Sequence, residues 1–360
     1  MMERYPFFRG GRLEGFVRTY GDYLEVTRLE REDVYLWEGR VGVRYTGGSP
    51  FFKACYEPPT APSSASLDSL EERLKRVADS IGSKLAGRKV MVDFSGGKDS
   101  TLNLLLLKAL SERVSFQVAP VYVHMPFLEP PENIDHAQWI AGKLGYDLEV
   151  VEPSRQQILF FLHRHGLPRR GQRWCTYLKM RALREARKRI SPSYEARAER
   201  VAESGKRAER LSRAYSKAAF LSGASLNLVY DLGIEQVASV LREQGLVHPH
   251  YLDGLPRVSC SLCPYRSLYE LELSSQYPLE DEGLVEHVAS SLYRRFYSVR
   301  VSWEEFWSYR LWRFPPSIAL ARLEERAHTR VEDSLSLEEA REMFRSIWTS
   351  SAASRVEDHG

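Results

Sequence analysis

The chain has 360 residues and 43% of them are hydrophobic, so it is long enough for two or three domains with a sizeable core. It contains no run of 18 apolar residues, and its first residues lack the apolar segment of a signal peptide. These features exclude a membrane-spanning helix, and we expect a soluble, cytoplasmic protein with no membrane partner. The net charge is only +3, but it is unevenly distributed.

Residues 1–57 predict a small β-rich unit. Polar and apolar side chains alternate there, with β-branched and aromatic residues at 23–27, 34–37 and 41–45. Residues 58–66 are rich in Pro, Ser and Ala and predict a linker. From residue 67 the pattern becomes helical.

A glycine-rich turn follows the apolar run at residues 90–94 and precedes a helical run at 101–108. It consists of Ser95, Gly96, Gly97, Lys98, Asp99 and Ser100. A strand, a glycine-rich turn and a helix N-terminus together bind phosphate, because the backbone N–H groups and the helix dipole point at the anion. Lys98 can neutralise phosphate charge, and the two serines can donate hydrogen bonds. The spacing is not that of a Walker A loop.

Further strands are predicted at 118–124 and 148–151, with a helix at 133–144 between them. This alternation predicts an α/β fold: a parallel sheet with helices on both faces. Ligands of such sheets bind at the carboxyl ends of the strands, where the glycine-rich turn and residues 124–126 fall. We expect one catalytic domain over 67–266 and a helical C-terminal region over 267–360.

The positive charge is concentrated between residues 164 and 217. This block has 17 Lys and Arg against 5 Glu, so it carries +12 and leaves −9 for the rest of the chain. Such a block indicates a phosphate-rich partner, either a nucleotide, a sulfonucleotide or RNA. The alternative is a solvated helical face with intrahelical ion pairs.

The chain has four cysteines, at 55, 175, 260 and 263. Structural disulfides are not expected in the cytoplasm. A C-x-x-C pair together with distant cysteines is typical of a metal or redox site.

Further motifs follow the glycine-rich turn in a fixed order. Arg-Trp-Cys-Thr begins at Arg173, R-x-x-E-S-x-x-R begins at Arg200, and His-Pro-His-Tyr begins at His248. Arg257 then precedes the C-x-x-C pair. With the SGGKDS turn, these elements resemble the PAPS (phosphoadenosine phosphosulfate) reductase family within the PP-loop ATP pyrophosphatase superfamily. The resemblance runs over about residues 70–266 and implies an adenine nucleotide alpha hydrolase-like fold.

The resemblance implies roles for individual residues. ATP, or PAPS or APS, would bind with Mg²⁺ across the SGGKDS turn and place its adenine near Met125. Catalysis would fall to Lys98, Asp99 and Ser100. The substrate-binding positions would be Arg173, Lys179, Arg200, Glu203, Ser204, Arg207 and Arg257. The spacing of Arg200, Glu203 and Arg207 is also that of ordinary helix pairs.

Two departures from the reductases bear on the reaction. The reductases use a cysteine near the C-terminus, but no cysteine follows Cys263 here, and their loop is degenerate where this one is intact. The preferred hypothesis is therefore an ATP pyrophosphatase that adenylates its substrate, releases pyrophosphate and acts as an adenylyl or sulfur transferase in sulfur metabolism or thiolation. The second is a true PAPS or APS reductase, an oxidoreductase that yields sulfite. The third is a non-catalytic, metal-stabilised scaffold that binds nucleotide and RNA.

Cys175, Cys260 and Cys263 fit a 4Fe-4S cluster with one iron left open, and Cys55 could close the site. Zn²⁺ held by four thiolates is the structural alternative, and unmetallated thiols are the third. Expected partners are an adenine nucleotide, tRNA or another nucleic acid at the 164–217 block, and a thiol or sulfur donor protein.

Overall fold

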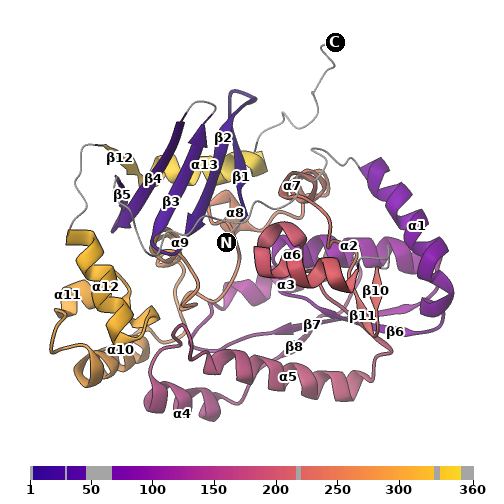
Figure 1. Ribbon diagram of the computed structural model, residues 1–360. Helices are drawn as coiled ribbons and strands as arrows, with labels where there is room; N and C mark the ends of the chain where they lie inside the picture. The colour runs from indigo at the N-terminus through magenta and orange to yellow at the C-terminus, as the bar shows by residue number, and fades with distance from the viewer. Residues whose placement is uncertain (1–2, 29–30, 46–66, 216–219, 328–332, 350–360) are drawn as a thin grey trace.

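The computed structural model describes residues 3–28, 31–45, 67–215, 220–327 and 333–349. The described residues form two six-stranded sheets with helices around them (Figure 1). The predicted linker at 58–66 and Cys55 lie outside these ranges. None of the helices in these ranges has the length and hydropathy of a membrane span.

The N-terminal sheet is antiparallel and has the order β1-β2-β3-β4-β5-β12. Its apolar face carries Val17, Leu24 and Trp37, which are all buried. The opposite face is also largely covered, because Tyr23, Leu36 and Val43 lie on it and are buried. The strands are β1 Tyr5–Arg9, β2 Arg12–Tyr20, β3 Tyr23–Arg28, β4 Arg31–Glu38, β5 Val41–Arg44 and β12 Ser334–Ser336.

The second sheet is largely parallel and has the order β10-β11-β9-β6-β7-β8. β6, β7, β8, β9 and β11 run parallel, and β10 pairs antiparallel with β11 at one edge. The apolar runs at 90–94, 118–124 and 148–151 form three of these strands. The strands are β6 Lys89–Asp93, β7 Gln117–Val123, β8 Glu149–Val151, β9 Tyr194–Ala196, β10 Leu221–Ser222 and β11 Ser225–Leu226.

Helices cover both faces of the parallel sheet. Helices α2 (Lys98–Arg113) and α3 (Glu132–Lys143) lie above it in Figure 1, and α5 (Trp174–Ile190) lies below. The predicted α/β class is confirmed. The predicted single parallel sheet is confirmed only in part, because half of the sheet strands belong to the antiparallel N-terminal sheet.

The remaining helices fill the C-terminal half and the edges of the fold. After residue 264 the chain is largely helical, and its tryptophans are mainly core residues: Trp312 is buried and Trp303 stacks on Trp307. These helices are α1 Leu67–Leu85, α4 Arg155–His165, α6 Gly205–Ala214, α7 Ile234–Glu243, α8 Pro249–Leu252, α9 Leu268–Ser274, α10 Glu282–Phe296, α11 Trp303–Ser308, α12 Pro316–Ala327 and α13 Leu337–Thr349, with 3₁₀ turns Val201–Glu203 and Leu311–Arg313.

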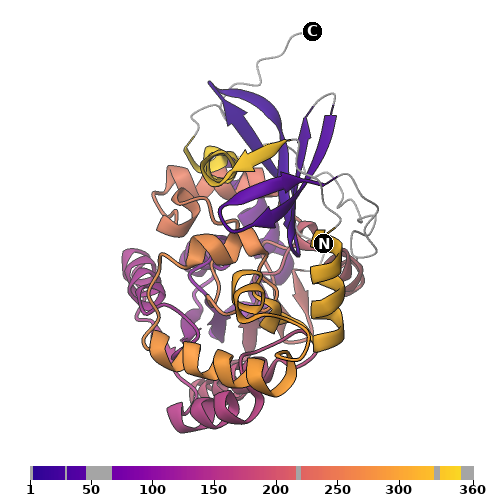
Figure 2. The same ribbon diagram turned by 90° about the vertical axis from the view of Figure 1, so that its left-hand side faces the viewer.

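The end of the described chain returns to its beginning. β12 pairs with β5, and α13 packs against β1, where the rings of Tyr5 and Phe344 lie 5.4 Å apart (Figure 2). Buried Asp22 connects the C-terminal helices to the same sheet, since its carboxylate accepts hydrogen bonds from Arg313 at 2.5 Å and from Arg326 at 3.3 Å. The predicted domain boundaries stay predictions, and the structure adds that residues 334–349 pack with the N-terminal unit.

Candidate functional site

The glycine-rich turn, called the phosphate loop from here on (residues 95–100), connects the end of β6 to the first turn of α2. Gly96 has φ +69°, a conformation that L side chains rarely adopt, and a Cβ on it would meet Ala137 of α3 at 3.4 Å. Glycine at this position therefore satisfies both the turn and the packing of α3 beside it.

Hydroxyl groups surround the N–H groups of the phosphate loop. Ser95 N donates to Ser100 Oγ at 3.2 Å, Gly97 N to Ser95 Oγ at 3.4 Å, and Lys98 N to the Tyr251 hydroxyl at 2.8 Å. Three N–H groups of the phosphate loop thus donate to hydroxyl oxygens. Tyr251 belongs to the His-Pro-His-Tyr motif, so this motif and the loop form one site.

Lys98 and Asp99 form a buried ion pair at the start of α2. The Lys98 ammonium lies 3.2 Å from Asp99 Oδ2, and both residues are almost fully buried. Burial alone lowers the pKa of Lys98, but Asp99 and the surrounding groups outweigh it and raise that pKa well above its ordinary value. Burial likewise raises the pKa of Asp99, but Arg200 and Lys98 outweigh it and hold that pKa below its ordinary range. Both groups are therefore charged at neutral pH.

A cavity of about 380 Å³ opens at the carboxyl ends of β6 and β7. Its size lies within the range of small-molecule sites. One wall is formed by Ser95 and the strand ends, a second by α5, and a third by the segment 258–264. Ser95, at the start of the phosphate loop, and the C-x-x-C pair, which are far apart in the sequence, thus line the same cavity.

The three described cysteines line this cavity together. Cys175 lies in the first turn of α5, and Cys260 and Cys263 lie in the turn on the opposite wall, where Cys263 N donates to Cys260 O at 3.2 Å. Each is partly buried and none is in a disulfide. Burial raises the pKa of Cys260 to about 12, and burial and the nearby Cys263 raise the pKa of Cys175. Deprotonating these thiols therefore needs added positive charge, such as a metal ion supplies.

The donor chemistry suits a thiolate-bound metal, but the ligands are not preassembled. Within the described ranges, no three His, Cys, Asp or Glu side chains are arranged closely enough to hold a metal ion. A cluster or zinc ion on Cys175, Cys260 and Cys263 would therefore require these side chains to come closer together.

Two acidic residues that line the cavity, Glu129 and Asp93, were not predicted from the sequence as site residues. Glu129 accepts hydrogen bonds from the Tyr122 hydroxyl at 2.8 Å and from Met125 N at 3.2 Å, and its Oε2 lies 3.6 Å from Lys179 Nζ. Burial raises the pKa of Glu129, but Lys179 and these hydrogen bonds outweigh burial and lower it. In the sequence, Glu129 follows β7 within an apolar, proline-rich segment. Its position just after a strand could have identified it as a candidate site residue.

Asp93, the last residue of β6, is the second of these acids. Its Oδ1 is buried and has no hydrogen-bond partner among the described residues, and its Oδ2 lies 3.9 Å from Arg197 Nε. Burial, with the nearby Glu195, raises the pKa of Asp93 to about 7. The sequence feature that could have identified Asp93 as a site residue is an acidic side chain within the apolar run at residues 90–94.

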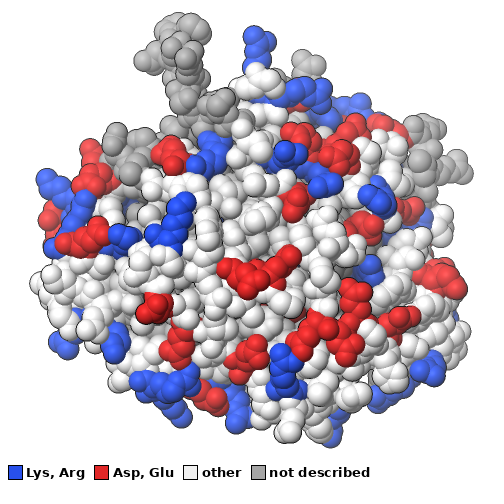
Figure 3. Space-filling model, turned by 180° about the vertical axis from the view of Figure 1, so that it is seen from behind, with Lys and Arg blue, Asp and Glu red and all other residues white. Residues whose placement is uncertain are grey.

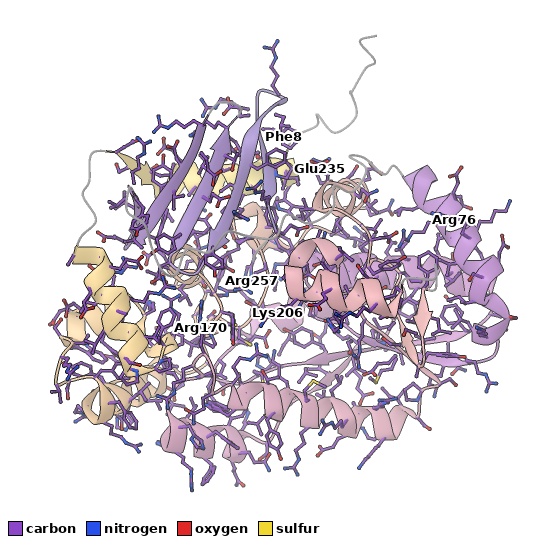
Figure 4. The ribbon with its side chains drawn as sticks, viewed as in Figure 1. Phe8, Arg76, Arg170, Lys206, Glu235 and Arg257 are labelled. Atoms are coloured by element: carbon purple, nitrogen blue, oxygen red, sulfur yellow. The ribbon has the colours of Figure 1, made fainter. Side chains whose placement is uncertain are left out.

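Two of the seven predicted substrate-binding residues line the cavity, and the other five pair with or cap other groups. Arg173 and Lys179 line the cavity. Arg257 pairs with Glu270 at 2.6 Å and lies, like Arg170, in the central region between the C-terminal helices and the parallel-sheet unit (Figure 4). The others have partners elsewhere: Arg200 pairs with Asp99, Arg207 with Glu203, Glu203 accepts from Arg200 N, and Ser204 caps α6.

The Met125 side chain is fully buried in the core beneath the C-terminal helices and does not line the cavity. The predicted adenine contact at Met125 and the other predicted site roles stay predictions.

No family model matches this chain. Two curated proteins of Methanocaldococcus jannaschii are similar to part of it. The uncharacterised protein MJ0066 is 26% identical over 200 residues, which are 53% of this chain and 39% of that protein. The uncharacterised protein MJ0973 is 27% identical over 179 residues, 49% of this chain and 41% of that protein. The chain thus spans about two fifths of the length of the curated relatives it matches.

Solved structures with a similar arrangement include the U34-tRNA thiolase NcsA from Methanococcus maripaludis with its 4Fe-4S cluster (16% identity, 64% of this chain and 82% of that chain, TM-score 0.39). An NH₃-dependent NAD synthetase from Campylobacter jejuni is 15% identical over 64% of this chain and 97% of that chain, with a TM-score of 0.36. A PAPS reductase from Candida auris is 13% identical over 53% and 92%, with a TM-score of 0.34.

Proposed function

We propose that this chain is an ATP-dependent enzyme, similar to the PAPS reductase family, that cleaves ATP between the α- and β-phosphates and adenylates an acceptor oxygen. One observation carries the proposal: Ser95, the first residue of the phosphate loop, and the three cysteines line the same cavity at the carboxyl ends of β6 and β7. A nucleotide bound there would lie with its phosphates on the loop and its α-phosphate toward the cysteines.

Each part of the site has a task in this reaction. The N–H groups of the phosphate loop and the Lys98 ammonium hold the β- and γ-phosphates, and they stabilise the negative charge of the departing pyrophosphate. The Tyr251 hydroxyl, which accepts from Lys98 N, yields this N–H to a phosphate oxygen and can donate its own hydrogen to the phosphate. Catalysis then consists of positioning and electrostatic stabilisation.

The cysteine site would serve the step after adenylation. Cys175, Cys260 and Cys263 would hold the metal centre, and an iron–sulfur cluster with one open iron would supply sulfur or electrons there. Lys179 stabilises negative charge at this end of the cavity, and Glu129 keeps the Lys179 ammonium in place at 3.6 Å.

A phosphate-rich acceptor such as tRNA suits the surface beside the cavity. Residues 155–190, which contain α4 and α5, have 11 Lys and Arg against one Glu. In Figure 3, Lys and Arg side chains project along the lower edge of the molecule, where α4 and α5 lie in Figure 1. The cavity opens between α5 and the segment 258–264, so an acceptor bound on this basic surface can reach the nucleotide.

The test uses the anaerobically purified protein with Mg²⁺ and ATP labelled at the α-phosphate, with water as the acceptor. We expect labelled AMP and an equal amount of pyrophosphate. Labelled ADP with inorganic phosphate, or tight ATP binding without any product, would contradict the proposal. Release of sulfite from labelled PAPS in place of ATP cleavage would identify a sulfonucleotide reductase instead.

We further propose that Asp93 accepts the proton of the attacking oxygen. Its carboxyl lines the cavity, and burial with the nearby Glu195 raises its pKa to about 7. A base works only when deprotonated, so we expect the rate of AMP formation to rise with pH up to about 7 and then to level off. Asp93→Asn should lower this rate by about 100-fold and remove its pH dependence. An unchanged pH profile in Asp93→Asn would assign the proton transfer to another group.

A further inference from the structure

A buried chain of alternating charges connects the N-terminal sheet to the phosphate loop. Glu3, which precedes β1, binds Arg200 through both carboxylate oxygens at 2.7 and 2.6 Å. Arg200 Nε donates to Asp99 Oδ1 at 2.5 Å, and Asp99 Oδ2 lies 3.2 Å from Lys98 Nζ. Arg200 is 0% exposed, Glu3 7% and Lys98 6%. Solvent therefore screens the interactions among these four groups less than it screens surface ion pairs.

The contacts of Arg200 fix its orientation. Besides the two carboxylates, Nη1 donates to Leu232 O at 3.0 Å, and the backbone N of Arg200 donates to Glu203 at 2.8 Å. A guanidinium with two carboxylates on its planar fork has little freedom to rotate. A shift of Glu3 would therefore shift Asp99 through the Arg200 guanidinium. A shift of Asp99 would in turn move the Lys98 ammonium.

The rest of the N-terminal segment is anchored at the same place. The Lys98 ammonium lies 5.9 Å from the centre of the Tyr5 ring, and the Tyr5 hydroxyl donates to Pro256 O at 2.5 Å. Pro256 begins the segment that leads to the C-x-x-C pair. The N-terminal sheet therefore contacts both sides of the site.

We propose that Glu3 is a positioning residue for the proposed ATP cleavage, so that the N-terminal sheet is a working part of the phosphate site. The four charges sum to zero. Without the Glu3 charge, the Arg200 guanidinium keeps its ion pair with Asp99, draws that carboxylate toward itself and weakens its hold on Lys98. The ammonium then moves from the position at which it meets the departing pyrophosphate. This inference rests on the proposed function.

The experiment compares Glu3→Gln with Glu25→Gln in the full chain. Glu25 is the matched control, because it is also a buried carboxylate of the N-terminal unit and pairs with Arg18 at 2.5 Å and Arg4 at 3.3 Å. We expect Glu3→Gln to lower kcat for AMP formation by about 10- to 100-fold, since a small misplacement of a catalytic group has an effect of this size. KM for ATP should change less than kcat. Glu25→Gln should keep the wild-type kcat.

Glu3→Asp keeps the charge on a shorter side chain and should recover part of the lost rate. Thermal unfolding and ATP-binding stoichiometry are measured for each variant, so that the rate is referred to folded protein. Equal kcat values in Glu3→Gln and Glu25→Gln, or no recovery in Glu3→Asp, would overturn the positioning role. If the wild-type protein forms no AMP, the proposed function is wrong, and the positioning role of Glu3 is overturned with it.

Discussion

Replacing Lys98 by alanine is expected to lower AMP and pyrophosphate formation by about 1000-fold while the protein stays folded. Removal of one preorganised group that stabilises transition-state charge has an effect of about 100- to 1000-fold, and Lys98 is at the upper end because its full charge is buried. The fold should persist because Asp99, the partner left behind, still pairs with Arg200 at 2.5 Å. Product formation from α-labelled ATP is the measurement.

The matched control is Lys108→Ala. Lys108 lies on the same helix and pairs with Glu112 on the surface, away from the phosphate loop. It should keep the wild-type rate. Rapid product formation by folded Lys98→Ala protein would contradict the role of the phosphate loop, and an equal loss in Lys108→Ala would show that the rate responds to helix stability alone.

The second large effect concerns the cysteines. We expect Cys260→Ser and Cys263→Ser each to lower the bound metal by more than 10-fold. Changing a residue that only supports a metal ligand weakens binding by about 10- to 100-fold, and loss of a direct ligand exceeds this. The measurement is the iron, sulfide and zinc content of anaerobically purified protein, together with its absorption spectrum. About four iron and four sulfide per chain would indicate the cluster, and one zinc would indicate a structural site.

Ser261→Ala provides the control within the same turn, because Ser261 lies between the two cysteines and carries no thiol. Its metal content should equal that of the wild type. Cys55→Ser tests whether the site has three or four thiolates: the bound metal should fall only if Cys55 is a ligand. Wild-type protein without iron or zinc would overturn the metal assignment and leave the phosphate loop as the only chemical centre of the proposal.

The sequence predicted the parts of the site that local patterns encode. The apolar run before Ser95 and the glycines at 96 and 97 place the phosphate loop at the end of β6, because strand, turn and helix are contiguous there. The C-x-x-C pair is one of the motifs that follow the glycine-rich turn in a fixed order, and the structure places it near the same edge of the sheet. The first is a consequence of short-range signals combined with the general rule for ligands of parallel sheets.

Other features depend on contacts that no local pattern shows. β9 has only three residues and sits next to β6, in a stretch that reads as basic and helical. The pairing of Glu3 with Arg200 joins residues 197 positions apart. Arg200 therefore looks like a free anion-binding residue in the sequence, whereas the structure buries it between two carboxylates. Long-range pairing of this kind is set by tertiary packing.

The pairing of β12 with β5 has a consequence for the synthesis of the chain. A ribosome that adds 5–20 residues per second needs roughly 15 to 60 seconds for the 290 residues that separate the end of β5 from β12. During this time the first five strands have emerged, but α13, which covers β1, has not been made. We expect the nascent chain to expose this apolar sheet face to chaperones. Since Glu3 precedes β1, the proposed site would become competent for ATP only as α13 docks on β1.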